Sequence, residues 1–169
     1  MLLVFKGESV LRELPRNQIS LKALTVWKIS AVISACISLI IGIAIGFGIY
    51  FFEFPFLITV GLAVVWVIYS ILSIFIIPKL RHRVWRYEVH EHEIDLQYGF
   101  FVVKRVLIPM VRVQHVDTHQ GPLLRKYHLA SIEISTAATT HEIPALDINE
   151  AEVLRDRISK LARVTDDDV

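Results

Sequence analysis

Apolar and polar positions along this 169-residue chain fall into three successive patterns, and the first is membrane-like. Residues 29–52 form a run of 24 residues without a charge, and residues 54–78 form another run of 25. Each run exceeds the roughly 20 apolar residues that a helix needs to cross a hydrocarbon layer of about 30 Å. The runs therefore predict a transmembrane hairpin over residues 21–78, with helices at about 24–52 and 55–78.

One charge, Glu53, separates the two apolar runs. Phe54 precedes Pro55, so helical geometry is disfavoured at Phe54, whereas proline suits the first turn of a new helix. The chain is expected to reverse here, with Glu53 in a turn at the far membrane surface.

Basic residues predict the orientation. Lys and Arg occur before the first run and directly after the second, but the hairpin loop has none. By the positive-inside rule both termini lie in the cytoplasm, so we expect a multi-pass protein of the plasma membrane.

The second pattern is alternation. Apolar and polar residues alternate over about 85–90, 94–98, 101–107 and 131–135, and a short run follows at 140–145. A period of two, bounded by turn residues, is typical of half-buried antiparallel strands. Residues 79–163 are therefore predicted to form a small, strongly bent sheet, preceded by a polar cytoplasmic segment at 1–20 and the hairpin.

The third pattern is an amphipathic helix that closes the domain. Asn149 and Glu152 have the spacing of a capping box, and the following apolar residues recur on one helical face. These residues are Ala151, Leu154, Ile158 and Leu161. We expect a helix of about fourteen residues, followed by a disordered acidic tail at 164–169.

Small residues recur every four positions in the first membrane helix, at Ser34, Ser38, Gly42 and Gly46. Such a stripe lets two helix backbones approach closely. Its partner is either the second membrane helix of the same chain or a helix of a neighbouring subunit.

A basic cluster follows the second run, at Lys79, Arg81, Arg83 and Arg86. It is interpreted first as a topology anchor and alternatively as a set of lipid-headgroup contacts, because each basic residue near an anionic surface contributes about 1 kcal/mol. The segment 79–169 carries thirteen Lys and Arg against fourteen Asp and Glu. This balance argues against a broad basic face and against nucleic-acid binding.

No catalytic set is apparent. The chain has no Gly-x-Ser-x-Gly elbow and no phosphate loop, and its single cysteine, Cys36, lies within an apolar run. Two histidine pairs, His90 with His92 and His115 with His119, each fit one strand face. They leave a metal-dependent enzyme open as an alternative, although no established ligand spacing accompanies them. We predict no catalytic residue, metal site or cofactor.

The segment from Ile108 to Ala137 resembles the YdbS-like family of bacterial membrane-anchored pleckstrin-homology (PH)-like domains, a family without an assigned activity. The matching positions are Ile108-Pro109, Arg112, Gln114, Gly121-Pro122-Leu123, Arg125, Tyr127, Leu129-Ala130 and Thr136-Ala137. The family usually has glycine where His128 stands. A left-handed residue that ends a short helical turn at 123–127 would explain that glycine, and histidine tolerates this conformation at a modest cost.

The resemblance implies an α+β membrane protein in which a transmembrane hairpin precedes a PH-like antiparallel barrel or sandwich with a C-terminal amphipathic helix. It also implies a binding or assembly module whose partner is a larger multi-domain membrane relative or a second copy, with membrane lipids around the hairpin. The motif's polar members supply a candidate interaction surface at Arg112, Gln114, Arg125 and Lys126. An anionic-lipid-binding module is a further alternative.

Overall fold

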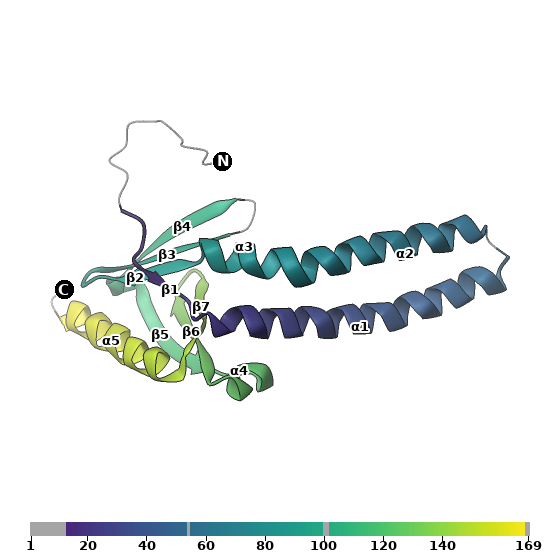
Figure 1. Cartoon of the computed structure of the whole chain (residues 1–169). Coiled ribbons are helices and arrows are strands. Elements are labelled where there is room, and N and C mark those ends of the chain that lie inside the picture. The colour runs from purple at the N-terminus through teal and green to yellow at the C-terminus, as the bar shows by residue number, and fades with distance from the viewer. Residues whose placement is uncertain (1–12, 54, 100–101, 168–169) are drawn as a thin grey trace.

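The computed structural model describes residues 13–53, 55–99 and 102–167 (Figure 1). A helical hairpin extends from one end of a domain that contains two antiparallel sheets. The first hairpin helix, α1, runs from Lys22 to Phe51, which corresponds to about 45 Å at 1.5 Å per residue. Ser20 supports its start, because the Ser20 hydroxyl accepts a hydrogen bond from the Lys22 amide at 3.3 Å.

The second hairpin helix is continuous from Phe56 to Val84, and both helices are long and apolar enough to cross a membrane. It consists of α2 (Phe56–Ile71), a π-helical turn (Leu72–Ile76) and α3 (Ile77–Val84). Glu53 lies exposed in the turn between α1 and α2, with a positive φ of 56°. The predicted hairpin and its turn are therefore confirmed.

The predicted end of the second helix at residue 78 is wrong. Pro78 lacks an amide hydrogen and would clash with the preceding turn of a regular α-helix. The π-helical turn accommodates it, since the Ile77 amide donates to the Leu72 carbonyl and the hydrogen-bond ladder is re-registered. The helix then continues to Val84, so most of the basic cluster lies on α3.

The described residues contain seven strands, which form two sheets. The first sheet has the order β1-β2-β3-β4, and the second has the order β5-β6-β7, with every pair antiparallel. The first comprises β1 (Asn17–Gln18), β2 (Arg86–Val89), β3 (Glu93–Gly99) and β4 (Val103–Pro109). The second comprises β5 (Val113–His119), β6 (Leu129–Thr136) and β7 (Thr140–Asp147).

Two further helices complete the domain. The short helix α4, Pro122–Lys126, connects β5 to β6, and α5, Ile148–Asp167, follows β7. Most apolar positions of the alternating strands are buried between the sheets and α5, with Ile94, Ile132 and Ile143 fully buried, but Val103 and Leu107 on β4 are exposed. Two small antiparallel sheets with a C-terminal helix match the PH-like fold that the resemblance implied.

The C-terminal helix differs from its prediction at both ends. Its apolar face is confirmed, since Ala151, Leu154 and Ile158 are buried. The cap lies earlier than expected, because the Asp147 carboxylate accepts from the Asn149 amide at 3.3 Å, the geometry of an N-cap aspartate. The helix has 20 residues and continues to Asp167, so the expected disordered tail is helical over most of its length.

The N-terminal segment is also more ordered than its composition predicts. Pro15 is among the fully buried side chains, and β1 pairs with β2. The Arg86 guanidinium donates to the Pro15 carbonyl at 3.4 Å, and Arg105 donates to the Glu13 carbonyl at 2.7 Å. Residues 13–18 therefore form a strap across the first sheet.

The predicted left-handed residue is confirmed, since α4 ends before His128, which has a φ of 55°. His128→Gly should raise the free energy of unfolding by about 0.5–1 kcal/mol, because the relieved left-handed strain of about 1–2 kcal/mol exceeds the added flexibility of the unfolded chain. Chemical denaturation of the full chain in detergent measures the change. As a control, Ala138→Gly, outside the left-handed region, should lower stability, and an equal loss at His128 would contradict the argument.

Candidate functional site

The domain has two ends that differ in chemistry. At the membrane-facing end, from which the hairpin leaves, Trp85 stacks on Tyr98 with ring centroids 5.5 Å apart, and Lys22 pairs with Asp147 at 3.4 Å (Figure 1). Each strand from β3 onward runs between this end and the opposite one. The opposite, distal end contains the turn between β2 and β3, the 3₁₀ turn Met110–Arg112 and the turn between β6 and β7.

A groove of about 430 Å³ lies at the distal end. We call it the distal groove. It is lined by Leu107, Ile108, Pro109, Val111, Arg112, Gln114, Thr136, Ala137, Ala138, Thr139 and His141. Six of the residues that carry the family resemblance are in this lining, although they come from two turns that are far apart in sequence. About half of the motif therefore meets at this one groove.

The turn at Met110 shapes one wall of the distal groove. Pro109 ends β4, and the Met110 amide donates to the His92 carbonyl at 2.9 Å. The Met110 side chain is fully buried, so its neighbour Val111 is turned outward and is half exposed. The strand register then shifts between Val113 and His115, as in a β-bulge. A bulge re-aims side chains, which explains why Gln114 reaches the groove.

Thr136 shapes the opposite wall. Its hydroxyl donates to the Thr139 carbonyl at 2.7 Å and accepts from the Thr139 amide at 3.1 Å. This local pairing closes the turn between β6 and β7 and leaves Ala137 exposed at its tip. The Thr139 hydroxyl also contacts the His141 ring at 2.9 Å. Hydrogen bonds among these lining residues thus stabilise this wall of the groove.

Two polar pairs, each with one buried member, lie outside the groove. The Arg105 guanidinium binds the Asp95 carboxylate at 2.5–3.1 Å, and this hydrogen bonding raises the pKa of Arg105. The Tyr87 hydroxyl donates to the Glu150 carboxylate, and burial together with this contact raises the pKa of Tyr87 above its ordinary range. The first pair joins β3 to β4 and the second joins β2 to α5, so both pairs stabilise the fold.

The comparisons with known proteins agree with this architecture. A family model described as bacterial PH domain matches residues 24–162. The chain belongs to the bacterial PH domain family. It is 60% identical over 159 residues to the UPF0699 transmembrane protein YdbS of Bacillus subtilis (strain 168), a match that covers 94% of this chain and 100% of that protein. No solved structure matches it.

In this bacterial PH domain the predicted interaction residues are divided between the two ends. Arg112 and Gln114 line the distal groove. Arg125 and Lys126 are exposed in the last turn of α4, on the side of the domain that faces the hairpin (Figure 1). They therefore do not form one continuous surface.

The juxtamembrane cations divide in a similar way. The Arg81 guanidinium lies 4.3 Å from the centre of the Trp27 ring, and Arg86 donates to the strap. Arg81 therefore joins the two hairpin helices, and Arg86 holds the strap to the first sheet. Lys79 and Arg83 are exposed and have no ion pair with any residue that the structure describes.

The stripe of small residues on α1 is only partly used by the second helix. The Ser38 hydroxyl accepts from the Trp66 indole at 3.0 Å, and a Cβ at Gly46 would lie 3.6 Å from Thr59. Ser34 is exposed, and a Cβ at Gly42 would meet nothing within 4 Å. An apolar cleft of about 780 Å³ between α1 and α2 includes Gly42 and Gly46.

The histidine pairs do not assemble into a metal site in the part of the chain that the structure describes, where no group of three His, Cys, Asp or Glu side chains comes together. His90 and His92 lie in the turn between β2 and β3 instead of on one strand face. His115 and His119 are exposed on β5, and His119 lies 3.7 Å from Glu142.

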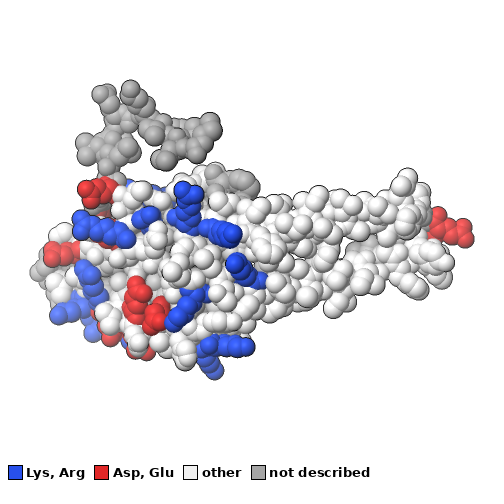
Figure 2. Space-filling model, viewed as in Figure 1, with Lys and Arg blue, Asp and Glu red and all other residues white. Residues whose placement is uncertain are grey.

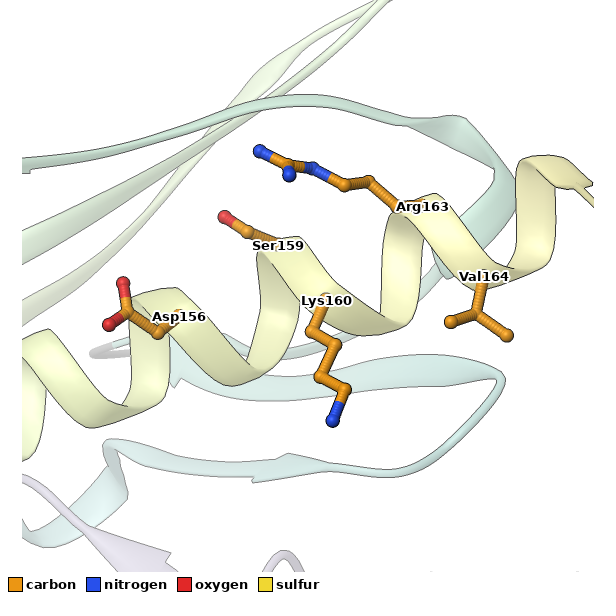
Figure 3. A pocket seen from close by; sticks show the side chains of 5 residues that line it. All are labelled: Asp156, Ser159, Lys160, Arg163 and Val164. Carbon is orange, nitrogen blue, oxygen red and sulfur yellow. The ribbon is translucent and has the colours of Figure 1, made fainter.

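A shallow hollow of about 340 Å³ on α5 contains Ser159, Lys160 and Arg163. Figure 3 shows Ser159 and Arg163 pointing to one side of the helix and Lys160 to the other. Because these side chains do not converge on one point, the hollow does not form an anion site. Lys160 and Arg163 lie in the C-terminal half of α5, the helix that runs away from the hairpin (Figure 1).

Sequence reasoning missed β1 and the burial of Asp95. A two-residue strand has no periodicity, so only its partner β2 defines it. Alternation predicted that Asp95 faces solvent, yet it is 1% exposed because the strap and Arg105 cover that face. The opposite charges of Asp95 and Arg105 on adjacent strands were the signal that could have predicted this ion pair.

Proposed function

We propose that the protein is a cytoplasm-facing, membrane-anchored binding and assembly module whose distal groove docks onto a second membrane protein. The proposed orientation follows from the basic residues, which flank the hairpin on the domain's side and are absent from its turn. The observation that carries the proposal is that six of the thirteen motif residues, from two turns far apart in sequence, line one groove.

The composition of the distal groove supports a protein partner. Leu107 is 45% exposed and Val111 is 50% exposed, whereas Arg112 and Gln114 supply polar groups beside them. Protein–protein interfaces typically have an apolar core, and arginine is enriched among the residues that contribute most to affinity. The hairpin also confines the domain to the membrane plane, which raises its effective concentration for a partner anchored in the same membrane.

The resemblance indicates the kind of partner. The family often pairs short proteins of this type with a larger relative that carries several such domains, so we propose that relative as the occupant of the groove. The proposal includes no catalytic step. A second copy of this chain is the alternative outcome.

Native mass spectrometry of the full chain, extracted gently from its own membranes, tests the proposal. We expect a discrete complex with another membrane protein. Arg112→Ala combined with Gln114→Ala should reduce the complexed fraction about tenfold, because arginine is enriched among the minority of interface residues whose truncation costs more than 1 kcal/mol.

The matched control truncates the two polar residues at the other end of the domain. Arg125→Ala combined with Lys126→Ala should leave the complex intact, since α4 lies at the membrane-facing end. A complex that survives the groove substitutions would refute this docking site. A lone chain that carries stoichiometric metal would favour the metal-dependent enzyme, and His90→Ala or His115→Ala should then abolish metal binding.

A further inference from the structure

The hairpin sets the level of the membrane surface on the domain. Lys28 is the last charged residue before the first apolar run, and Lys79 is the first after the second. The start of α1 at Lys22 lies six residues before Lys28, or about 9 Å along the helix axis. A headgroup layer is roughly 5–8 Å thick on each side, so elements beside Lys22 lie where headgroups meet water.

Three contacts link the residues directly after α4 to the start of α1. Asp147 pairs with Lys22 at 3.4 Å, and Leu129 lies opposite Asp147 in the pairing of β6 with β7. The Ile148 amide donates to the His128 carbonyl at 3.2 Å, directly after α4 ends. Through β6 and β7, α4 is therefore held at the end of the domain from which the hairpin leaves (Figure 1).

Unpaired cations gather on this face. Arg125 and Lys126 on α4 and Lys79 and Arg83 on α3 are exposed, and none makes an ion pair with a described residue. Figure 2 shows basic side chains along the boundary between the domain and the hairpin, whose long middle part is uncharged. The long stems of Lys and Arg allow their charged ends to reach the headgroups from this position.

Exposed apolar residues accompany the cations. Val102 is 69% exposed and Val103 is 54% exposed, at the hairpin-side end of β4. The stacking of Trp85 on Tyr98 holds the adjoining part of β3 beside the end of α3. Exposed apolar residues that lie beside basic residues at the level of the headgroups indicate a surface that contacts the membrane.

We propose that the membrane-facing end of the domain is a docking surface for anionic phospholipid headgroups of the adjacent leaflet. Arg125 and Lys126 of α4 bind headgroup phosphates together with Lys79 and Arg83 of α3, while Arg81 and Arg86 hold the domain in place. This lipid contact fixes the orientation of the domain and leaves the distal groove directed away from the bilayer. It does not depend on the identity of the protein partner.

Native mass spectrometry of the full chain released from nanodiscs tests the proposal. The nanodiscs contain equal parts of phosphatidylcholine and phosphatidylglycerol, and the ratio of the two lipids retained by the protein is measured. We expect phosphatidylglycerol to be enriched on the native chain. Arg125→Gln combined with Lys126→Gln should reduce the enrichment at least about fivefold, the approximate contribution of one basic residue near an anionic surface.

The control removes the same charge elsewhere. Lys160→Gln combined with Arg163→Gln should leave the enrichment unchanged, because both residues lie on the distal part of α5. Equal losses in the two double variants would show that only net charge matters and would overturn the proposal, as would a native chain that shows no enrichment.

Two further measurements address charge screening and folding. The enrichment on the native chain should decline at about 1 M NaCl, where the screening length is about 3 Å, and its persistence would refute electrostatic docking.

Should the α4 variant unfold, Lys79→Gln combined with Arg83→Gln tests the same surface from α3. Unchanged enrichment in that variant would count against the proposal. The groove variant should retain its lipids, which separates this result from failure of the assembly proposal.

Discussion

Ile158→Ala is expected to lower the free energy of unfolding of the domain by about 3 kcal/mol, within the 2–5 kcal/mol typical of such truncations. Ile158 is fully buried where α5 packs on the sheets, beside Ala151 and Leu154. Truncation removes apolar contacts and leaves a cavity that the surrounding strands fill only partly. Chemical denaturation of the full chain in detergent, followed by the fluorescence of buried Trp85, measures the loss.

Val153 provides a control on the same helix. It is a β-branched residue that is 70% exposed, so Val153→Ala removes little buried surface and improves helix propensity slightly. We expect no loss of stability from this change. Similar losses at both positions would mean that α5 contributes through its helical propensity and not through the face packed on the core.

The apolar face of α5 was predictable because helical periodicity is a property of the sequence alone. Its N-cap was not, since Asn149 and Asp147 are both good caps and the choice depends on where β7 ends. The strap at residues 13–18 escaped prediction for the same reason. Its order comes from Arg86 and Arg105, which lie about 70 and 90 residues further along the chain.

The candidate site shows the same limit. The sequence placed Arg112, Gln114, Arg125 and Lys126 in one motif, yet the structure divides them. Gln114 lies at the start of β5, and the second pair follows the end of this strand, whose seven residues cover about 23 Å at 3.3 Å per residue. Residues before and after a strand that crosses the domain must lie at opposite ends. The convergence of Ala137 on the distal groove required strand pairing and was not visible in the sequence.

This separation of the two ends also lets one small domain accommodate the two proposed contacts. The hairpin, Lys22 and α4 define the end at the membrane, whereas the turns at Met110 and Thr136 define the end that faces away. A protein partner at the distal groove and a lipid surface at the membrane-facing end do not compete for the same residues. Substitutions at either end should therefore separate partner binding from lipid enrichment.

Arg105→Ala is the second change with a large expected effect, a loss of about 3 kcal/mol in the free energy of unfolding. Asp95 is 1% exposed, and Arg105 binds both of its carboxylate oxygens. Removal of the guanidinium leaves a buried carboxylate without its ion-pair partner, which typically costs 3–5 kcal/mol. The strap also loses the hydrogen bond to the Glu13 carbonyl.

A double variant identifies the cause of that loss. Asp95→Leu combined with Arg105→Met removes both charges and keeps similar volumes, and such replacements of a buried ion pair are often neutral or stabilising. We expect the double variant to recover most of the stability that Arg105→Ala loses, as measured by the same denaturation experiment. If the double variant is as unstable as Arg105→Ala, the contact with the strap, and not the unpaired carboxylate, carries the stabilisation. The strap would then be an integral part of the first sheet, and truncation before Asn17 should destabilise the domain to a similar extent.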